Sequence, residues 1–281
     1  MATRSALINV MVRAAHRAGR QLVRDFGEVE QLQVSRKGPA DFVSQADINA
    51  EKTLTIELTK ARPAFGLLME ESGATAGEDP DRRWIVDPLD GTTNYLHGIP
   101  HWAISIAAET RGEITAGVIF NPVTDELFWA EKGHGAYLNE RRLRVSARRV
   151  MKEAVLATGI PFHGRPGHER TLAELARITP QVAGIRRFGA AALDLAWVAA
   201  GRFDGFWESG LNPWDVAAGA LLVQEAGGFV TGIDGGHDPV NGGSVLAANA
   251  SLHLMIGKEL RLAARNGEAA ATPATKPAKH P

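Results

Sequence analysis

The chain has 281 residues, a formal net charge of −1 and no cysteine. With 44% hydrophobic residues, a chain of this length can bury a large core, so extensive disorder is excluded. The charge excludes a general attraction to nucleic acid or anionic membranes, the lack of cysteine excludes disulfides, and no apolar run reaches the roughly 20 residues of a membrane span. We therefore expect a globular protein without a membrane anchor, in the reducing cytoplasm.

The first 24 residues contain five arginines and no acidic residue. This composition is typical of an organellar transit peptide and also fits a folded helix. Apolar side chains at three- and four-residue steps favour the helix: Leu7, Val10, Met11, Ala14, Ala18 and Leu22. We expect this helix to pack on the body of the protein, followed by an exposed strand over residues 29–34.

A second helix is predicted between Ser44 and Pro63. Asp47 follows Ser44 by three residues, which is the spacing of a capping box, and an acid at this position also complements the helix dipole. On this spacing alone, helix capping is a sufficient explanation for an acid at position 47.

Two apolar runs end directly in carboxylates. Residues 65–69 run into Glu70 and Glu71, and residues 84–86 run into Asp87. Buried strands that both end in acids can place these groups side by side at one sheet edge, with residues 74–82 as the loop between them.

The segment that follows residue 86 combines acids with a turn. Pro88 restricts the backbone so that Asp87 and Asp90 face the same side as the Leu89 carbonyl. Oxygen ligands without cysteine suit Mg²⁺, and the successive N–H groups of Gly91, Thr92 and Thr93 can form an anion-binding concavity. The segment predicts a magnesium site for a phosphate ester, and the alternative is a plain turn capped by Asp90.

Residues 101–145 alternate apolar runs with turn sequences, which predicts an antiparallel meander. The next segment is the most basic of the chain: Arg141, Arg142, Arg144, Arg148, Arg149 and Lys152. A solvated hairpin and linker explains it, and an RNA-binding or partner-binding patch is the alternative. A soft internal boundary is placed near residue 150.

The second half alternates strand and helix. Helices are predicted over residues 171–178, 189–200 and 216–226, and strands over 153–158, 184–188 and 205–209, the last of which contains Glu208. Asp215 is expected at the N-cap of the third helix, where a capping role alone can explain it.

Two motifs resemble the signatures of the inositol monophosphatase family of Mg²⁺-dependent, lithium-sensitive phosphatases: WIVDPLDGTTN at residues 84–94 and NPWDVAAGALLVQEAGG at residues 212–228. Upstream MEES and QAD fall in the expected order, so the resemblance covers nearly the whole chain. It implies an α/β fold, a layered αβαβα sandwich with a mostly antiparallel first sheet, and a homodimer. Residues 1–265 would form one catalytic unit and residues 266–281 a disordered tail.

The resemblance also implies roles for individual residues. Glu70, Asp87 and the Leu89 carbonyl would hold one Mg²⁺, while Asp87, Asp90 and Asp215 would hold a second, with two or three ions per site. Thr92, paired with Asp47, would orient and deprotonate the attacking water, and Glu70 would share in catalysis. The residues implied to contact the substrate are Glu70, Leu89, Asp90, Gly91, Thr92, Gly189, Ala190, Ala191, Glu208 and Asp215. Ala190 departs from the family pattern, in which a hydroxyl residue is common.

The activity implied is hydrolysis of inositol monophosphate, a small phosphate monoester, by a metal-activated water. Fructose 1,6-bisphosphate, histidinol phosphate and 3′-phosphoadenosine 5′-phosphate are alternative substrates, because the same metal core serves all of them. In a different class, the chain would act as a partner of the transcription or ribosome-assembly machinery.

Overall fold

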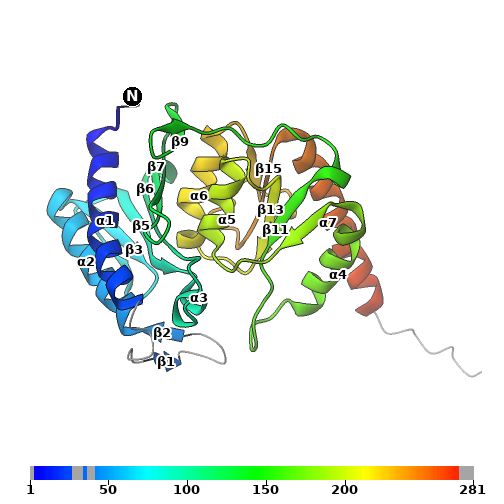
Figure 1. Cartoon of the computed structure of the whole chain (residues 1–281), viewed down its shortest axis with the longest axis horizontal. Coiled ribbons are helices and arrows are strands. Elements are labelled where there is room, and N and C mark those ends of the chain that lie inside the picture. Colours follow the sequence, from blue (N-terminus) through cyan, green and yellow to red (C-terminus); the bar gives the residue numbers. More distant parts are fainter. Residues whose placement is uncertain (1–2, 27–33, 37–41, 272–281) are drawn as a thin grey trace, which may run out of the picture.

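The computed structural model describes residues 3–26, 34–36 and 42–271. Its helices and sheets stack in the order helices, sheet, helices, sheet, helices (Figure 1). Three groups of buried apolar side chains fill the structure: one under the first helix pair, one around the central helices and one under the last helix pair. The predicted αβαβα sandwich is therefore confirmed.

The first two layers come from the N-terminal half. Helices α1 (Ala6–Phe26) and α2 (Gln45–Ala61) cover an eight-stranded sheet in the order β10-β9-β8-β7-β6-β5-β3-β4. Its strands are β3 (Phe65–Met69), β4 (Gly73–Thr75), β5 (Asp79–Asp90), β6 (Ala103–Thr110), β7 (Glu113–Asn121), β8 (Glu126–Glu131), β9 (Gly135–Leu138) and β10 (Arg141–Arg142). Only the β3 and β5 pair in this sheet is parallel, as predicted for a mostly antiparallel sheet. A hairpin of β1 (Val34–Arg36) and β2 (Phe42–Ser44) lies between the two helices in the chain.

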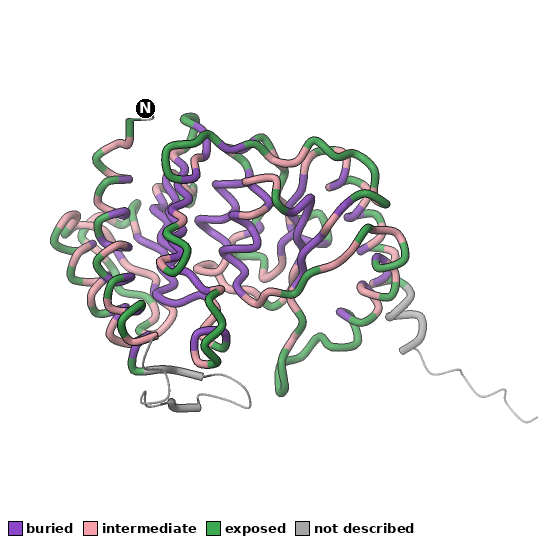
Figure 2. Tube along the Cα trace, in the orientation of Figure 1, coloured by how far each residue is buried: buried purple, intermediate pink, exposed green. Residues whose placement is uncertain are grey.

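The central layer consists of α5 (Ala191–Ala199) and α6 (Pro213–Glu225), which are buried along most of their length (Figure 2). Small residues allow the close approach of these helices. A Cβ atom at Gly219 would lie 2.5 Å from Cβ of Leu195, so a larger residue there would force α5 and α6 apart.

The last two layers come from the C-terminal half. A five-stranded mixed sheet has the order β12-β11-β13-β15-β14, and α4 (His168–Ile178) and α7 (Ala250–Ala271) cover its outer face (Figure 1). The strands are β11 (Val155–Thr158), β12 (Gly184–Arg186), β13 (Gly205–Ser209), β14 (Phe229–Thr231) and β15 (Ser244–Ala248), and short 3₁₀ turns occupy Met151–Glu153 and Thr179–Gln181. Among the helices that the structure describes, we find none with an apolar segment long enough to cross a bilayer.

Most predicted elements are present, with three differences. Residues 74–82 are not a loop, because they contain most of β4 and the start of β5. The central helix predicted from residue 189 begins at Ala191. Helix α7 continues to Ala271, six residues into the segment expected to be a tail, while most of the exposed strand expected over residues 29–34 lies outside the described residues.

Candidate active site

Two parallel strands bring the first acids together. Met69 of β3 pairs with Val86 of β5, and the Glu70 N–H donates to the Val86 carbonyl at 3.3 Å. Glu70 and Asp87 therefore follow neighbouring strands at the same level, as expected from their positions after two apolar runs.

The acidic motif lies inside β5, not beyond its end as predicted. Asp87 pairs with Ser105 and Asp90 with Ala103, so that Pro88 and Leu89 bulge out opposite a single residue of β6. Pro88 has no N–H to donate to β6, and the Leu89 N–H instead donates to Asp87 Oδ1 at 2.9 Å. The pairing of β5 with β6 resumes at Asp90, after the bulge. The local sequence does not reveal this continuation of the strand.

Asp90 joins the two halves of the chain. Its Oδ2 accepts the N–H of Ala192 at 2.8 Å, in the first turn of α5. A carboxylate at this end of a helix is stabilised by the helix dipole and by the free N–H groups. The hydrogen bond from Ala192 therefore fixes the Asp90 side chain against the first turn of α5.

Asp215 reaches the site from α6. It is the third residue of that helix, and Asn212 occupies the N-cap, so the prediction that Asp215 is the cap itself is wrong. Asp215 Oδ2 accepts the N–H of Asn212 at 2.7 Å. Pro213 takes the first helical position because the N–H it lacks would have no partner inside the helix.

Burial, joined for Glu70, Asp87 and Asp90 by the charges of neighbouring acids, raises the pKa of the clustered carboxyl groups. Burial, followed by the charge of Asp215, raises the pKa of Glu70 to about 8. Burial and Asp215 likewise raise the pKa of Asp90 to about 7, and burial raises that of Asp215 to about 6. The pKa of Asp87 lies well above its usual value because the side chain is buried and faces Glu70 and Asp90. Four carboxyl groups therefore cannot all be ionised here without cations.

The donor set fits a hard cation. Glu70 and Asp87 shift each other's pKa, so the two carboxyl groups are neighbours in the buried cluster. A cation can offset their charge, and carboxylate and carbonyl oxygens are the ligands that Mg²⁺ prefers. One oxygen each of Asp47, Glu70 and Glu71 also lie within 4.8 Å of one another. Glu71 was expected at this sheet edge together with Glu70, but it is not among the residues to which the family resemblance gives a role.

Thr92 lies between the motif and the second helix. Its hydroxyl donates to the Leu89 carbonyl at 2.9 Å and stands 3.5 Å from Oδ2 of Asp47, a long distance for a hydrogen bond. Asp47 is buried in the first turn of α2. A capping box would pair Asp47 with Ser44, but the Ser44 side chain lies outside the described part of the structure. The structure does place the Asp47 carboxylate next to the Thr92 hydroxyl.

Gly91 connects β5 to the short helix α3 (Thr92–Leu96) with φ of +91°. A Cβ atom at this position would lie 3.1 Å from the His101 carbonyl and 3.3 Å from Cβ of Ala190. Glycine is therefore favoured at position 91 both by the positive φ and by the lack of space for a Cβ atom.

Substitution of Gly91 tests this close contact. We expect Gly91→Ala to lower the free energy of unfolding by roughly 1 to 2 kcal/mol or more, because an L-residue is strained at this φ. Thermal or urea unfolding measures the loss, and Gly112→Ala is a control with positive φ and open space around its Cβ. Because both glycines have positive φ, an equal or larger loss in the control would show that the contacts around Gly91 are unimportant.

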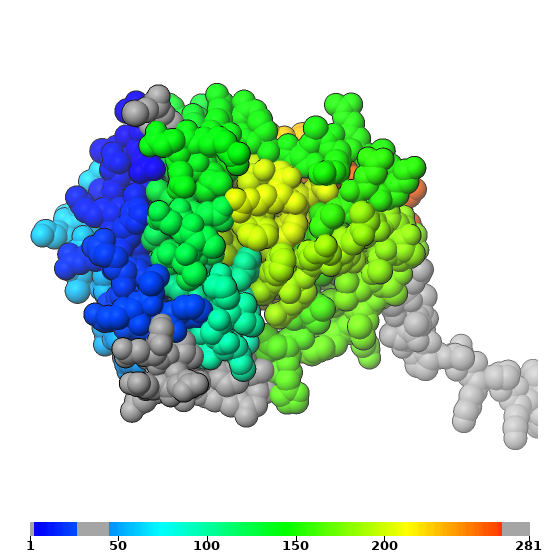
Figure 3. Space-filling view, in the orientation of Figure 1, coloured from blue at the N-terminus to red at the C-terminus, as the bar shows by residue number. Residues whose placement is uncertain are grey.

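A cavity of about 270 Å³ opens over these residues. Eight predicted site residues line it: Glu70, Asp90, Gly91, Thr92, Gly189, Ala191, Glu208 and Asp215. The other four, Asp47, Asp87, Leu89 and Ala190, are buried behind this lining. The Asn94 side chain donates to the Phe188 carbonyl at 2.7 Å, which holds α3 against the segment before α5. Figure 3 shows the teal region of the first half packed against the green and yellow surface of the second half.

The cavity has cationic groups that no motif indicated. Arg165 and Arg187 line it with Ile160, Pro161 and Phe162, and the Arg165 guanidinium lies 5.0 Å from the Phe162 ring. Burial, with Asp215 and Asp90 next, raises the pKa of Glu208 to about 8, and the charge of Arg187 opposes this. The sequence signal was weak because both arginines lie in loops without a recognisable pattern.

The basic segment predicted as a hairpin and linker lies away from this cavity. Arg141, Arg142, Arg144 and Arg149 are exposed, and the Arg148 guanidinium donates to Asp204 Oδ1 at 3.2 Å. Arg148 thus has a structural partner, while the neighbouring arginines face solvent.

Comparisons with known proteins agree with this geometry. The chain is 60% identical over 256 residues to a protein named inositol-1-monophosphatase from Caulobacter vibrioides, covering 90% of this chain and 100% of that protein. It is 45% identical to a protein named Nus factor SuhB from Pseudomonas aeruginosa, over 86% of this chain and 91% of the relative. The crystal structure of the extragenic suppressor protein suhB from Bartonella henselae matches with a TM-score of 0.89 and 60% identity, over 92% of this chain and 99% of that one. The model of the inositol monophosphatase family matches residues 3–265, and the chain belongs to that family.

Proposed function

We propose that this protein is a Mg²⁺-dependent phosphomonoesterase that hydrolyses inositol monophosphate to inositol and phosphate. The observation that carries this proposal is the convergence of acids from both halves of the chain, Glu70 and Asp90 from the first and Asp215 from the second, on one cavity. Family membership and the relatives named inositol-1-monophosphatase support the same substrate.

The proposed metal ligands follow from the donor set. Glu70, Asp87 and the Leu89 carbonyl would hold one Mg²⁺, and Asp87, Asp90 and Asp215 a second. When bound, Mg²⁺ would lower the pKa of water, polarise the phosphoryl group and neutralise charge on the leaving oxygen. Fixed hydrogen bonds from Leu89, Ala192 and Asn212 hold Asp87, Asp90 and Asp215 in orientation, so that little rearrangement is needed for binding.

Thr92 and Asp47 would handle the proton of the attacking water. A hydroxyl can accept a hydrogen bond from water while it donates its own proton to a carboxylate. In the structure the Thr92 hydroxyl lies nearer to the Leu89 carbonyl, at 2.9 Å, than to Asp47 Oδ2, at 3.5 Å, and a small movement of the side chain would direct its proton to Asp47. Asp47 would then act as the base through Thr92.

Phosphate and polyol would occupy different parts of the cavity. Backbone N–H groups of Gly91 and Thr92 would meet the phosphate, and Gly189, Ala191 and Glu208 would contact the polyol. Ala190 is buried and has no hydroxyl, so the hydrogen bond expected from a hydroxyl residue there would be missing.

A substrate panel tests the proposal. Phosphate release should be compared for inositol 1-phosphate, fructose 1,6-bisphosphate, histidinol phosphate and 3′-phosphoadenosine 5′-phosphate. We expect the highest kcat/KM for inositol 1-phosphate. A tenfold preference for one of the other three would assign the protein to that substrate within the same chemistry.

Lithium inhibition is a separate prediction. We expect millimolar Li⁺ to lower turnover of inositol 1-phosphate at fixed Mg²⁺, as the family resemblance implies. Equal concentrations of Na⁺ control for ionic strength. Undiminished turnover throughout a Li⁺ titration across the millimolar range would argue against the proposed metal arrangement.

A second candidate function rests on relatives named Nus factor SuhB, such as the one from Pseudomonas aeruginosa. The exposed arginines of the segment 141–152 offer a surface for such a partner. Capture of RNA polymerase by the immobilised protein, compared with a variant in which Arg141, Arg144 and Arg149 are replaced by Gln, tests it.

We further propose a homodimer in the cytoplasm, which size-exclusion chromatography with light scattering and cell fractionation would check.

A further inference from the structure

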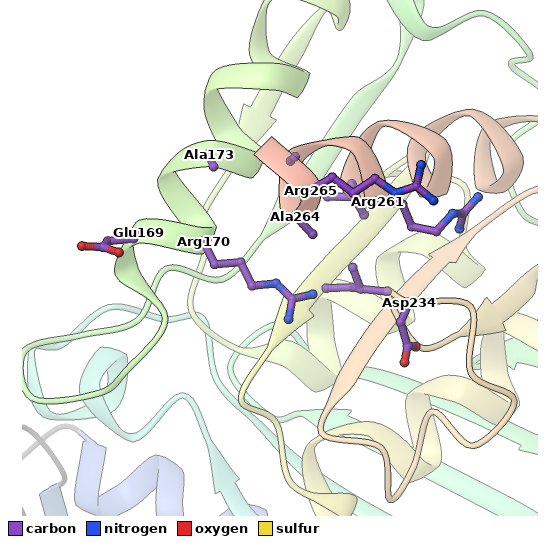
Figure 4. Close-up of a pocket in the computed structure, with 10 residues that line it drawn as sticks. Glu169, Arg170, Ala173, Asp234, Arg261, Ala264 and Arg265 are labelled. Carbon is purple, nitrogen blue, oxygen red and sulfur yellow. The ribbon is translucent and has the colours of Figure 1, made fainter. Parts of the chain in front are cut away.

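A second cavity lies on the far side of the C-terminal sheet from the central helices. It has a volume of about 550 Å³ and is formed by α4, α7 and the segment after β14 (Figure 4). Its floor is apolar, because Ile233, Leu260 and Ala263 line it and are buried. This volume is within the range of about 300 to 1,000 Å³ in which small organic molecules bind.

Three arginines surround this floor: Arg170 from α4, and Arg261 and Arg265 from α7. Arg261 and Arg265 are one helical turn apart and therefore lie on the same face of α7. Among the described residues we find no carboxylate paired with either of them, and a titratable neighbour of Arg261 is His253, whose pKa is lowered by burial first and then by the Arg261 charge. Two exposed cations thus stand beside an apolar cavity without a carboxylate partner in the part of the chain that the structure describes.

The acids of the cavity do not neutralise this pair. The Glu169 carboxylate points away from the three arginines (Figure 4). Asp234 Oδ1 accepts the N–H of Gly236 at 2.9 Å, within its own turn. Asp234 keeps its negative charge, but the three arginines of the lining outnumber it, so the cavity as a whole favours an anion.

Arg170 ties the cavity to a buried pair in the fold. Its Nε donates to Glu174 Oε1 at 2.9 Å, and the indole N–H of Trp207 donates to Glu174 Oε2 at 3.1 Å. Glu174 and Trp207 are almost fully buried. An anion that binds Arg170 competes with Glu174, so the Trp207 indole proton reports on the cavity from inside the protein.

We propose that this cavity is a binding site for a small organic anion with an apolar body. The anionic group, a carboxylate, sulfonate or phosphate, would contact Arg261 and Arg265 and would compete with Glu174 for Arg170, and the apolar body would cover Ile233, Leu260 and Ala263. The site is separate from the carboxylate cavity, since the two share no lining residue.

The probe for this site is 1-anilinonaphthalene-8-sulfonate, which combines a sulfonate with an aromatic body. Binding is measured by its fluorescence and by the ¹H–¹⁵N resonance of the Trp207 indole, assigned with Trp207→Phe. We expect saturable binding and a shift of that resonance in the wild-type protein. The double variant Arg261→Gln/Arg265→Gln should bind at least about tenfold more weakly, and Arg149→Gln, at an exposed arginine elsewhere, should bind as the wild type does.

A second variant fills the cavity without changing charge. Ala173 lines it, so Ala173→Phe should abolish the Trp207 shift, whereas Ala176→Phe, on the exposed side of the same helix, should leave it in place. The proposal is overturned if the double arginine variant binds the probe within twofold of the wild type, or if Arg149→Gln weakens binding equally. It is also overturned if Ala173→Phe keeps the full Trp207 shift.

Discussion

Asp90→Asn is expected to lower kcat/KM for inositol 1-phosphate by roughly a thousandfold or more, because it removes a charge that would hold Mg²⁺ and counter the phosphoryl group. The fold should persist, since the asparagine carbonyl can still accept the Ala192 N–H. The metal-free variant should be at least as stable as the wild type, because one of four mutually repelling acids is gone. Phosphate release and thermal unfolding in EDTA measure the two effects.

Asp204→Asn is the matched control. Asp204 is also buried, but its carboxylate pairs with Arg148 and accepts the Val155 N–H at 2.8 Å, far from the cavity lining. We expect this variant to lose about 1 to 3 kcal/mol of stability and to keep near-native kcat/KM. The opposite pattern, with Asp90→Asn fully active, would remove Asp90 from the proposed metal ligands.

The metal-free protein should lose stability as the pH rises from about 5 to 8. Glu70 has an ordinary pKa of 4.5 and a folded pKa of about 8, and Asp90 and Asp215 are raised to about 7 and about 6. Between these values the folded protein holds protons that the unfolded chain has released, so each pH unit costs roughly 1.4 kcal/mol for each such proton. The contribution is complete below the unfolded pKa and is lost as the pH passes the folded pKa.

Mg²⁺ should reverse this trend. It binds ionised carboxylates, so its stabilising effect should be larger at pH 8 than at pH 5. Thermal unfolding of EDTA-treated protein with and without Mg²⁺, across this pH range, makes the measurement, and Asp90→Asn should show a shallower pH dependence. A metal-free Tm that rises towards pH 8 would contradict the clustering of these acids.

The layers of the fold were predictable because their signals are local. The apolar stripe of α1 and the runs at residues 65–69 and 84–86 predicted helix and strands, and family resemblance supplied their arrangement. The sequence pattern did not reveal α3, β14, β15 or α7. The bulge at Pro88 and Leu89 also escaped prediction, because it depends on the register of β5 against β6.

The site was predictable to a different extent for different residues. Acids at strand ends pointed to Glu70, Asp87 and Asp90, whereas Asp47 and Asp215 had adequate explanations as helix-terminal acids until the resemblance linked them to the motif. Arg165 and Arg187 could not be predicted, because only the folded chain brings their loops over the carboxylates. The local sequence pattern therefore indicated the residue types of the site but not which residues, distant in the chain, would meet in the folded protein.

The most direct test of the proposed metal-dependent hydrolysis is phosphate release from inositol 1-phosphate by protein stripped with EDTA and then given Mg²⁺ in steps. We predict no turnover above background in the stripped protein and recovery of full activity as Mg²⁺ is added. Full turnover in excess EDTA would contradict the account, because the clustered carboxylates would then have no catalytic cation to hold.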